Sequence, residues 1–100
     1  MSDSAWVYIM VNKQQSIMHI SCCVDLWDQV TQHKALTGTP LHASHQTVFL
    51  VYFEPQENLL VAEQRAKKIR RWPRNWRLAL IERENPEWLD LYAGLSNEPA

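Results

Sequence analysis

The chain has 100 residues, a formal net charge of −1 and five tryptophans, a balance typical of a folded domain rather than of a disordered chain. No stretch approaches the run of about 18 apolar residues that a membrane-spanning helix needs, so we expect no membrane partner. The residues before Trp6 contain no basic and apolar leader, and the adjacent Cys22 and Cys23 make a poor disulfide pair. We therefore expect a reducing, cytoplasmic location.

The first part of the chain predicts two strands and a helix. Residues 6–11 and 16–23 are apolar runs rich in aromatic and branched side chains, and the polar residues 12–15 between them favour an antiparallel hairpin. Asp25 has the position of an N-cap, because apolar residues follow it at helical spacing in a short helix over 25–34.

The second part predicts one more strand and two helices after a loop over residues 37–46. Residues 47–53 are apolar almost throughout, which predicts a central strand covered on both faces and ended by the Glu-Pro pair that follows. Residues 57–71 and 74–84 contain good helix formers, and a proline separates the two helices.

One side of each of these two helices is apolar and is expected to face the core. In the first helix that side consists of Leu59, Ala62, Ala66 and Ile69, and in the second it consists of Trp76, Ala79 and Leu80. A last turn over 87–92 would place Trp88 and Leu91 on the core. Residues 1–95 are thus predicted to form a single domain with the element order ββαβαα, and residues 96–100 a disordered tail.

The charge of the chain is unevenly distributed. Seven of its ten basic residues lie within 65–77, whereas many of its acids follow residue 81. A cationic helix is the electrostatic footprint of nucleic-acid binding, and the candidate phosphate contacts are Lys67, Lys68, Arg70, Arg71, Arg74 and Arg77. The interleaved Trp72 and Trp76 add flat surfaces of the kind that single-strand binders use. The alternative is a solvated helix face whose tryptophans pack in the core, which is the commoner role of large aromatic residues.

The histidines leave two interpretations open. His42 and His45 lie in the predicted loop without partners at the spacing of a zinc site, so we expect no structural metal there. His19 lies on the second predicted strand among apolar residues. It is either a satisfied, half-buried side chain or a group that transfers protons.

Short words of sequence, taken in their order along the chain, match a known domain. They are Trp6-Val7-Tyr8-Ile9, His19-Ile20-Ser21, Asp25-Leu26, His33-Lys34, Leu50-Val51-Tyr52-Phe53-Glu54, Arg65 with Ile69 and Trp72, Trp76 with Leu80-Ile81-Glu82, Asn85-Pro86-Glu87-Trp88 and Asp90-Leu91-Tyr92. In these words the chain resembles the GIY-YIG endonuclease domain, and in particular its small stand-alone bacterial members. The likeness covers residues 6–95, and the Asn-Pro-Glu-Trp word is its most specific part.

The resemblance implies an α/β (α+β) fold with a small three-stranded antiparallel sheet flanked by helices. It also implies cleavage of phosphodiester bonds in DNA with Mg²⁺ or Mn²⁺ as the cofactor. In active members, a first tyrosine orients the attacking water and a second tyrosine holds the nucleophile or the phosphate. An arginine then stabilises the developing charge, and a glutamate binds the metal.

Most of this machinery is missing here. Tyr8 matches the first tyrosine, but His19, Gln29 and Ala66 stand at the positions of the second tyrosine, the arginine and the metal-binding glutamate. A methyl group binds no metal, and a neutral amide does not replace a guanidinium. We therefore predict a catalytically degenerate GIY-YIG-like protein that needs no cofactor and binds DNA through its basic helix.

Two alternatives come from other classes of function. A divergent endonuclease would use Tyr8 and His19 together with Glu63, which lies one helical turn before Ala66, and would need Mg²⁺ or Mn²⁺. A homo-oligomeric or protein-interaction module would use apolar surface that so small a domain does not bury. In that case Trp27 is expected to be partly exposed and to anchor the partner.

Overall fold

The computed structural model describes residues 4–37 and 47–95. Its sheet has three antiparallel strands in the order β2-β1-β3, namely β1 (Ala5–Val11), β2 (Met18–Cys23) and β3 (Phe49–Gln56). The helical elements are α1 (Leu26–Thr37), α2 (Leu59–Arg71), α3 (Arg74–Glu84) and the 3₁₀ helix η2 (Leu91–Gly94). The predicted α+β class, the antiparallel sheet and the element order are confirmed.

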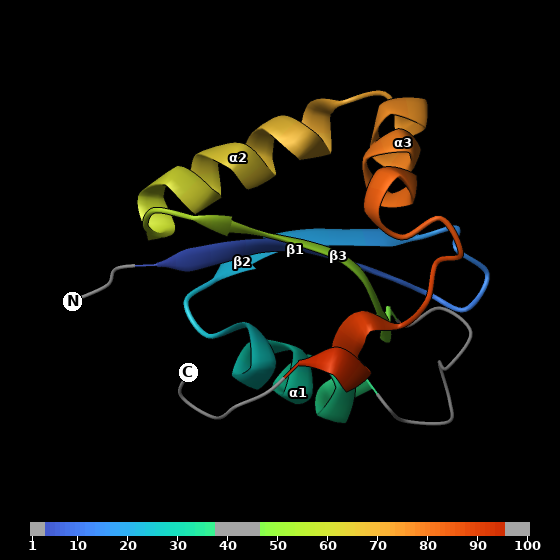
Figure 1. Ribbon diagram of the computed structural model, residues 1–100, viewed down its shortest axis with the longest axis horizontal. Coiled ribbons are helices and arrows are strands. Elements are labelled where there is room, and N and C mark those ends of the chain that lie inside the picture. The colour runs from blue at the N-terminus through green and yellow to red at the C-terminus, as the bar shows by residue number, and fades with distance from the viewer. Residues whose placement is uncertain (1–3, 38–46, 96–100) are drawn as a thin grey trace.

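Helices cover both faces of the sheet (Figure 1). α2 and α3 lie over one face, where Ile9 of β1 belongs to the same apolar core as Ala66 and Ile69 of α2. α1 and η2 lie over the other face, where Tyr8 of β1 shares a second core with Val30 of α1. Because neighbouring strand residues point to opposite faces, β1 supplies side chains to both cores and is buried along almost its whole length.

β3 is an edge strand, although its apolar sequence predicts a central one. The sheet order places β1 in the centre. β3 is apolar because helical elements cover both of its faces, with Leu50 in one core and Val51 in the other. An edge strand accommodates a proline that a central strand excludes. β3 therefore continues through Pro55 to Gln56 instead of ending at the Glu-Pro pair.

The segment that follows α3, residues 85–90, closes part of the outer edge of β3. A shift of register leaves Val51 without a partner in the pairing of β3 with β1. The buried Asn85 side chain donates from Nδ2 to the Val51 carbonyl at 3.1 Å, and Asp90 Oδ1 accepts from the Leu50 amide at 3.0 Å. The Asn-Pro-Glu-Trp word thus lies in a clip on the sheet edge, which we call the β3 clip.

Side chains fix the starts of two helices. Asp25 caps α1 as predicted, since its Oδ1 accepts from the Asp28 amide at 3.0 Å. α2 begins two residues later than predicted, at Leu59, because the Asn58 side chain caps it. Leu59 is 41% exposed, so its predicted place on the core side of the helix is wrong, whereas the other three residues of that side are buried.

Some predictions concern residues that the structure does not describe. The loop with His42 and His45 lies outside the described residues, and so does the tail over 96–100. In the part that is described, none of the helices has the length and apolar character that a membrane crossing requires.

Candidate functional site

Two of the predicted catalytic residues lie side by side on the sheet face that α1 covers. Tyr8 of β1 pairs with Ser21 of β2, and His19 lies two residues before Ser21, on the same face. The ring centroids of Tyr8 and His19 are 5.9 Å apart, and Tyr8 is only 1% exposed. The sequence therefore identified a pair of aromatic side chains that the strand register does bring together.

Tyr8 is a hydrogen-bonding group rather than a base at neutral pH. Burial raises the pKa of its hydroxyl, and hydrogen bonds with Ser21 and Gln29 oppose that shift without cancelling it. The phenol therefore stays protonated. Gln29, which stands at the arginine position of the resemblance, meets Tyr8 with a neutral amide that supplies no charge for a phosphate.

His19 is half-buried beside a second histidine. The ring centroids of His19 and His33 are 4.8 Å apart, and His33 Nε2 lies 2.9 Å from the Thr47 hydroxyl oxygen. Burial lowers the pKa of His19, and the nearby His33 and Arg70 lower it further. His19 is therefore a neutral imidazole at pH 7. It is able to accept a proton, so both interpretations from the sequence remain open.

Glu63 does not join Tyr8 and His19. It lies on α2, which covers the opposite face of the sheet (Figure 1), and its side chain is exposed. Its charge acts instead on Cys22, whose pKa is raised by burial and by Glu63. The three residues that a divergent nuclease would use are thus divided between the two sides of the sheet.

Ala66 lies fully buried in the apolar core between α2 and the sheet. The position that the resemblance assigns to a metal-binding glutamate therefore faces hydrocarbon, across the sheet from Tyr8. Within residues 4–37 and 47–95, no group of three or more His, Cys, Asp or Glu side chains is arranged to hold a metal ion. Beside Tyr8, the Gln29 amide stands where the resemblance places an arginine, and the His19 imidazole stands where it places a tyrosine.

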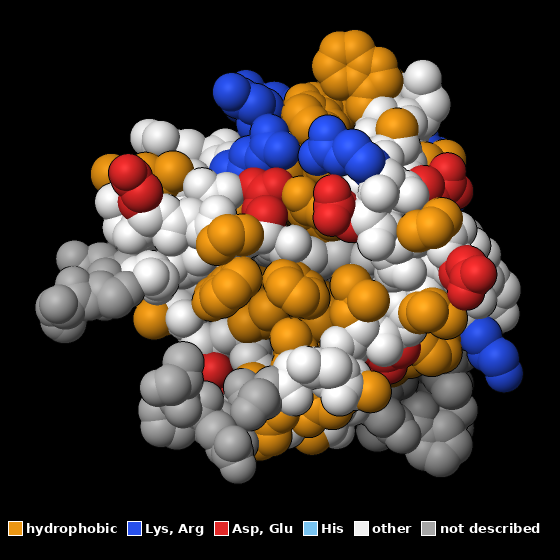
Figure 2. All heavy atoms as spheres, viewed as in Figure 1, with side chains coloured by type: hydrophobic (Ala, Val, Ile, Leu, Met, Phe, Trp, Pro, Cys, Tyr) orange, Lys and Arg blue, Asp and Glu red, His pale blue; other side chains and the backbone are white. Residues whose placement is uncertain are grey.

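Four of the predicted nucleic-acid-binding residues are exposed on α2, and three of these four share one hollow. Lys67, Lys68 and Arg71, which we call the outer cations, line a hollow of about 340 Å³ together with Gln64 and Trp72. Among the described residues, none of the three forms an ion pair with an acidic side chain. Figure 2 shows Lys and Arg side chains gathered over α2. This surface presents positive charge to the solvent.

The other three predicted contacts lie towards β2 and the hairpin. Arg70 Nε donates to the Ile20 carbonyl and Arg74 Nη2 to the Gln15 carbonyl, each at 2.9 Å. Arg77 is half-buried, and its Nε has no hydrogen-bond partner in the described structure. We call Arg70 and Arg74 the anchored arginines. A carbonyl group carries no net charge, so they keep their positive charge while being held in place.

Arg65, the first of the seven clustered basic residues, is paired with an acid. Its Nε donates to Glu54 Oε2 at 2.8 Å, and the Tyr52 hydroxyl donates to Glu54 Oε1 at 2.5 Å. Burial and the Glu54 carboxylate raise the pKa of Tyr52. This network was not predicted from the sequence. The signal was available, since residues two apart on a strand share a face.

Trp76 is exposed, contrary to the prediction that it forms part of the buried side of α3. Its side chain is 55% exposed, Ala79 is exposed too, and Leu80 alone of the three predicted residues is buried. In Figure 1, α3 descends from the corner after α2 towards the sheet, so its first turn lies far from the sheet. Trp72 is half-buried and packs against the core, as predicted.

Trp27 is the residue predicted to anchor a protein partner. It lies in the first turn of α1 and is half-buried, so the expected partial exposure is confirmed. One half-buried side chain does not define an interface, and oligomerisation stays a prediction.

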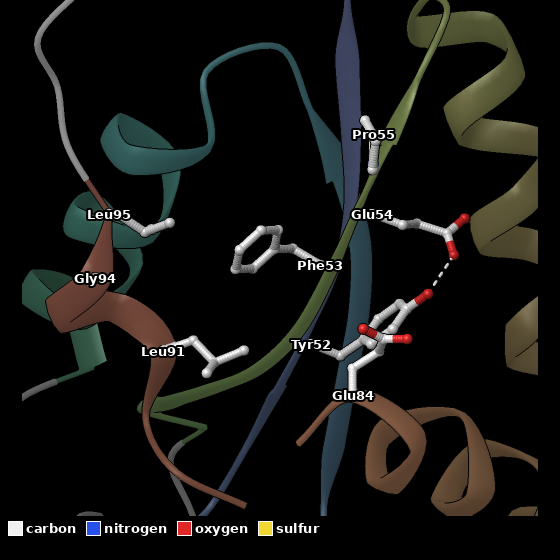
Figure 3. A pocket seen from close by; sticks show the side chains of 8 residues that line it. All are labelled: Tyr52, Phe53, Glu54, Pro55, Glu84, Leu91, Gly94 and Leu95. Atoms are coloured by element: carbon white, nitrogen blue, oxygen red, sulfur yellow. Dashed lines mark hydrogen bonds between the residues drawn. The ribbon is translucent and has the colours of Figure 1, made fainter.

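A groove of about 530 Å³, which was not predicted from the sequence, lies beside β3. Phe53 points from β3 towards Leu91 and Leu95, whereas Tyr52 and Glu54 point to the other side of the strand (Figure 3). The walls of this groove come mainly from β3 and η2, which are far apart in the sequence. The Tyr8 and His19 pair contributes nothing to its lining.

Comparisons of this chain with protein-family models, with curated proteins and with solved structures found no match. The GIY-YIG assignment therefore stays a prediction that rests on the short sequence words, while the α+β class and the element order are observed.

Proposed function

We propose that this chain is a catalytically degenerate GIY-YIG-like domain that binds nucleic acid through the outer cations Lys67, Lys68 and Arg71. The observation that carries the proposal is the exposure of these three cations together on α2, in a chain whose net charge is −1. A phosphate backbone is attracted to such a concentration of charge, and binding releases the counterions that the nucleic acid holds.

The anchored arginines extend this positive surface towards β2. Because backbone carbonyls hold the guanidinium groups of Arg70 and Arg74, these side chains lose less conformational freedom when a phosphate binds. The surface then combines the exposed outer cations with two arginines that backbone carbonyls hold in place. The alternative is a solvated helix face whose charge has no ligand.

The residues at the catalytic positions of the resembled family support the proposal that this chain has lost catalytic activity. Gln29 supplies an amide and Ala66 a buried methyl group, and Glu63 lies across the sheet from Tyr8. A phosphodiesterase site works by positioning charge around the phosphate, so the loss of several such groups removes activity together. We expect the protein to act in the reducing cytoplasm, where Cys22 and Cys23 stay thiols.

A salt titration of binding tests the proposal. We expect oligonucleotide affinity to fall steeply with salt, measured as fluorescence anisotropy of a labelled strand. Lys68→Gln should reduce the slope of log K against log[salt] by about 0.7–0.9, the value for one phosphate contact. Lys13→Gln is the matched control, because it removes the same charge from an exposed position on the hairpin, and it should leave the slope unchanged.

The two parts of the proposal fail separately. Binding that is absent at low salt, or that does not depend on salt, overturns the nucleic-acid part. Incubation of labelled DNA with the protein and Mg²⁺ or Mn²⁺ should leave the DNA intact. Metal-dependent cleavage that disappears in Tyr8→Phe would show that the site is active, and would overturn the degenerate part.

A further inference from the structure

The corner between α2 and α3 presents an indole to solvent. Trp76 is the most exposed of the aromatic residues, all of which lie in the described part of the chain. Trp72 meets it edge to face, with centroids 5.8 Å apart and ring planes at 71°. The guanidinium carbon of Arg65 lies 5.1 Å from the Trp72 ring centroid. Trp72 is thus held between neighbours, and Trp76 offers the open ring surface.

Hollows lie on both sides of this tryptophan pair: one has cationic walls, and the other is mainly apolar, with Arg83, which pairs with Glu84 at 3.7 Å, at its margin. On one side are the outer cations, in the hollow that they share with Trp72. On the other side, Trp72 and Trp76 line a hollow of about 330 Å³ together with Leu80 and Arg83. Figure 2 shows hydrophobic side chains standing out at the top of the view, over the corner between α2 and α3, beside Lys and Arg side chains. The aromatic surface of the corner therefore lies directly beside the positive charge of the outer cations.

We infer that the ligand of this surface is a single-stranded nucleic acid, with an unpaired base stacked on Trp76 and its phosphates on Lys67, Lys68 and Arg71. The inference rests on the proposed function and adds the class of nucleic acid. Proteins that bind single strands combine a cationic path for the backbone with aromatic rings for the bases, because every base has a face that stacks.

The position of Trp76 favours a single strand over a duplex. In a duplex each base is stacked between its neighbours, and only its edges are accessible from the grooves. An exposed indole therefore finds no base face on a duplex, which would contact the outer cations alone. On a single strand, the same indole exchanges its exposed apolar surface for base stacking.

The experiment compares three ligands with the full-length chain: a labelled (dT)₁₀ strand, the corresponding (rU)₁₀ strand and a DNA duplex. We expect Trp76→Ala to weaken binding of the single strand about tenfold, as for the loss of one stacked base, and to leave duplex binding unchanged. Trp76→Phe should retain most of the affinity. Leu60→Ala is the control, because Leu60 is also exposed and apolar but lies at the other end of α2.

Tryptophan fluorescence gives a second measurement that does not depend on the alanine variant. Binding of (dT)₁₀ should quench the emission of the unmodified protein, and Trp76→Phe should remove most of that quenching while it still binds. If the variant binds and the quenching persists, another indole is responsible and the inference is wrong. The (dT)₁₀ and (rU)₁₀ arms show whether DNA or RNA is the preferred strand.

The outcomes separate this inference from the proposed function. Salt-dependent binding that Trp76→Ala leaves unchanged, or weakens equally for the duplex and the single strand, overturns the stacking inference and keeps the cationic surface. Tighter binding of the duplex by the unmodified protein overturns it as well. No binding of any of the three ligands at low salt overturns both.

Discussion

The two edges of the sheet are closed by different chemistry. At β3, the neutral Asn85 and the carboxylate of Asp90 bind the backbone, and Asp90 pairs with Lys34 at 2.7 Å. At β2, Arg70 binds the Ile20 carbonyl of the strand, and Arg74 binds the Gln15 carbonyl in the turn that precedes the strand; both keep their charge. Both arrangements satisfy edge groups that would otherwise be open to pairing with another chain. At β2, however, the closing groups also add positive surface.

This difference shows that residue type alone does not assign a role. The sequence places Arg70 and Lys68 in one basic cluster, yet the structure gives them different neighbours. Arg70 is tied to the Ile20 carbonyl, whereas Lys68 reaches solvent. Substitutions at the two edges compare their contributions to stability. Substitutions of one anchored arginine and one outer cation separate contributions to stability from contributions to nucleic-acid binding.

Among these substitutions, one that breaks the β3 clip should cause the largest loss of stability. Asn85→Ala removes the hydrogen bonds of a buried amide with the Val51 carbonyl, the Leu89 carbonyl and the Leu89 amide. Since the groups left behind are partly buried and lose their partner, we expect the free energy of unfolding to fall by about 3 kcal/mol. Urea unfolding measures it. Asn75→Ala, an exposed residue of α3, should change stability by less than about 0.5 kcal/mol.

A change at the β2 edge should lower stability less than a change at β3, but it should also weaken binding. Arg70→Ala removes a part-buried hydrogen bond to the Ile20 carbonyl, which we expect to cost about 0.5–1 kcal/mol of unfolding free energy, and it removes a phosphate contact as well. Lys68→Ala should lower nucleic-acid affinity by a similar factor with no measurable loss of stability. Unfolding curves and binding isotherms of the two variants make the comparison. Equal stability of both variants would show that Arg70 does not hold the edge.

The features of the fold that could be predicted are those set by local pattern. Two apolar runs separated by polar residues predicted the hairpin, and Asp25 predicted the start of α1. The edge position of β3 could not be predicted in the same way. An apolar run indicates that both faces of a strand are covered, but it does not indicate which strands lie on either side of that strand. Pro55 was the available clue, because edge strands tolerate proline.

In the candidate site, too, only the features set by local pattern could be predicted. Tyr8 and His19 meet because strand alternation and register place them on one face. Glu63 was assigned to the same site because it lies one turn from Ala66, but the side of the sheet that α2 covers decides what a helix residue reaches. The exposure of Trp76 likewise depends on the angle between two helices, which no local pattern encodes.

Acid should weaken the β2 edge through His19, with a smaller effect than the two changes above. Its folded-state pKa lies below the ordinary value of 6.5, so the unfolded chain binds the proton first. The contribution of the neutral ring is therefore complete above pH 6.5 and is lost as pH falls towards the lowered pKa. Protonation would place a positive charge beside His33 and Arg70, the groups that lower the pKa of His19 together with burial.

Unfolding free energies of the unmodified protein and of His19→Gln, measured from about pH 8 to pH 5, test this effect. We expect the two curves to run parallel above pH 6.5. Below it, the unmodified protein should lose stability faster, because the glutamine has no proton to bind. Groups common to both proteins cancel in the difference, so a difference that stays constant with pH would show that His19 titrates alike in the folded and unfolded chain. Neither burial nor the charges of His33 and Arg70 would then lower the pKa of His19 in the folded chain.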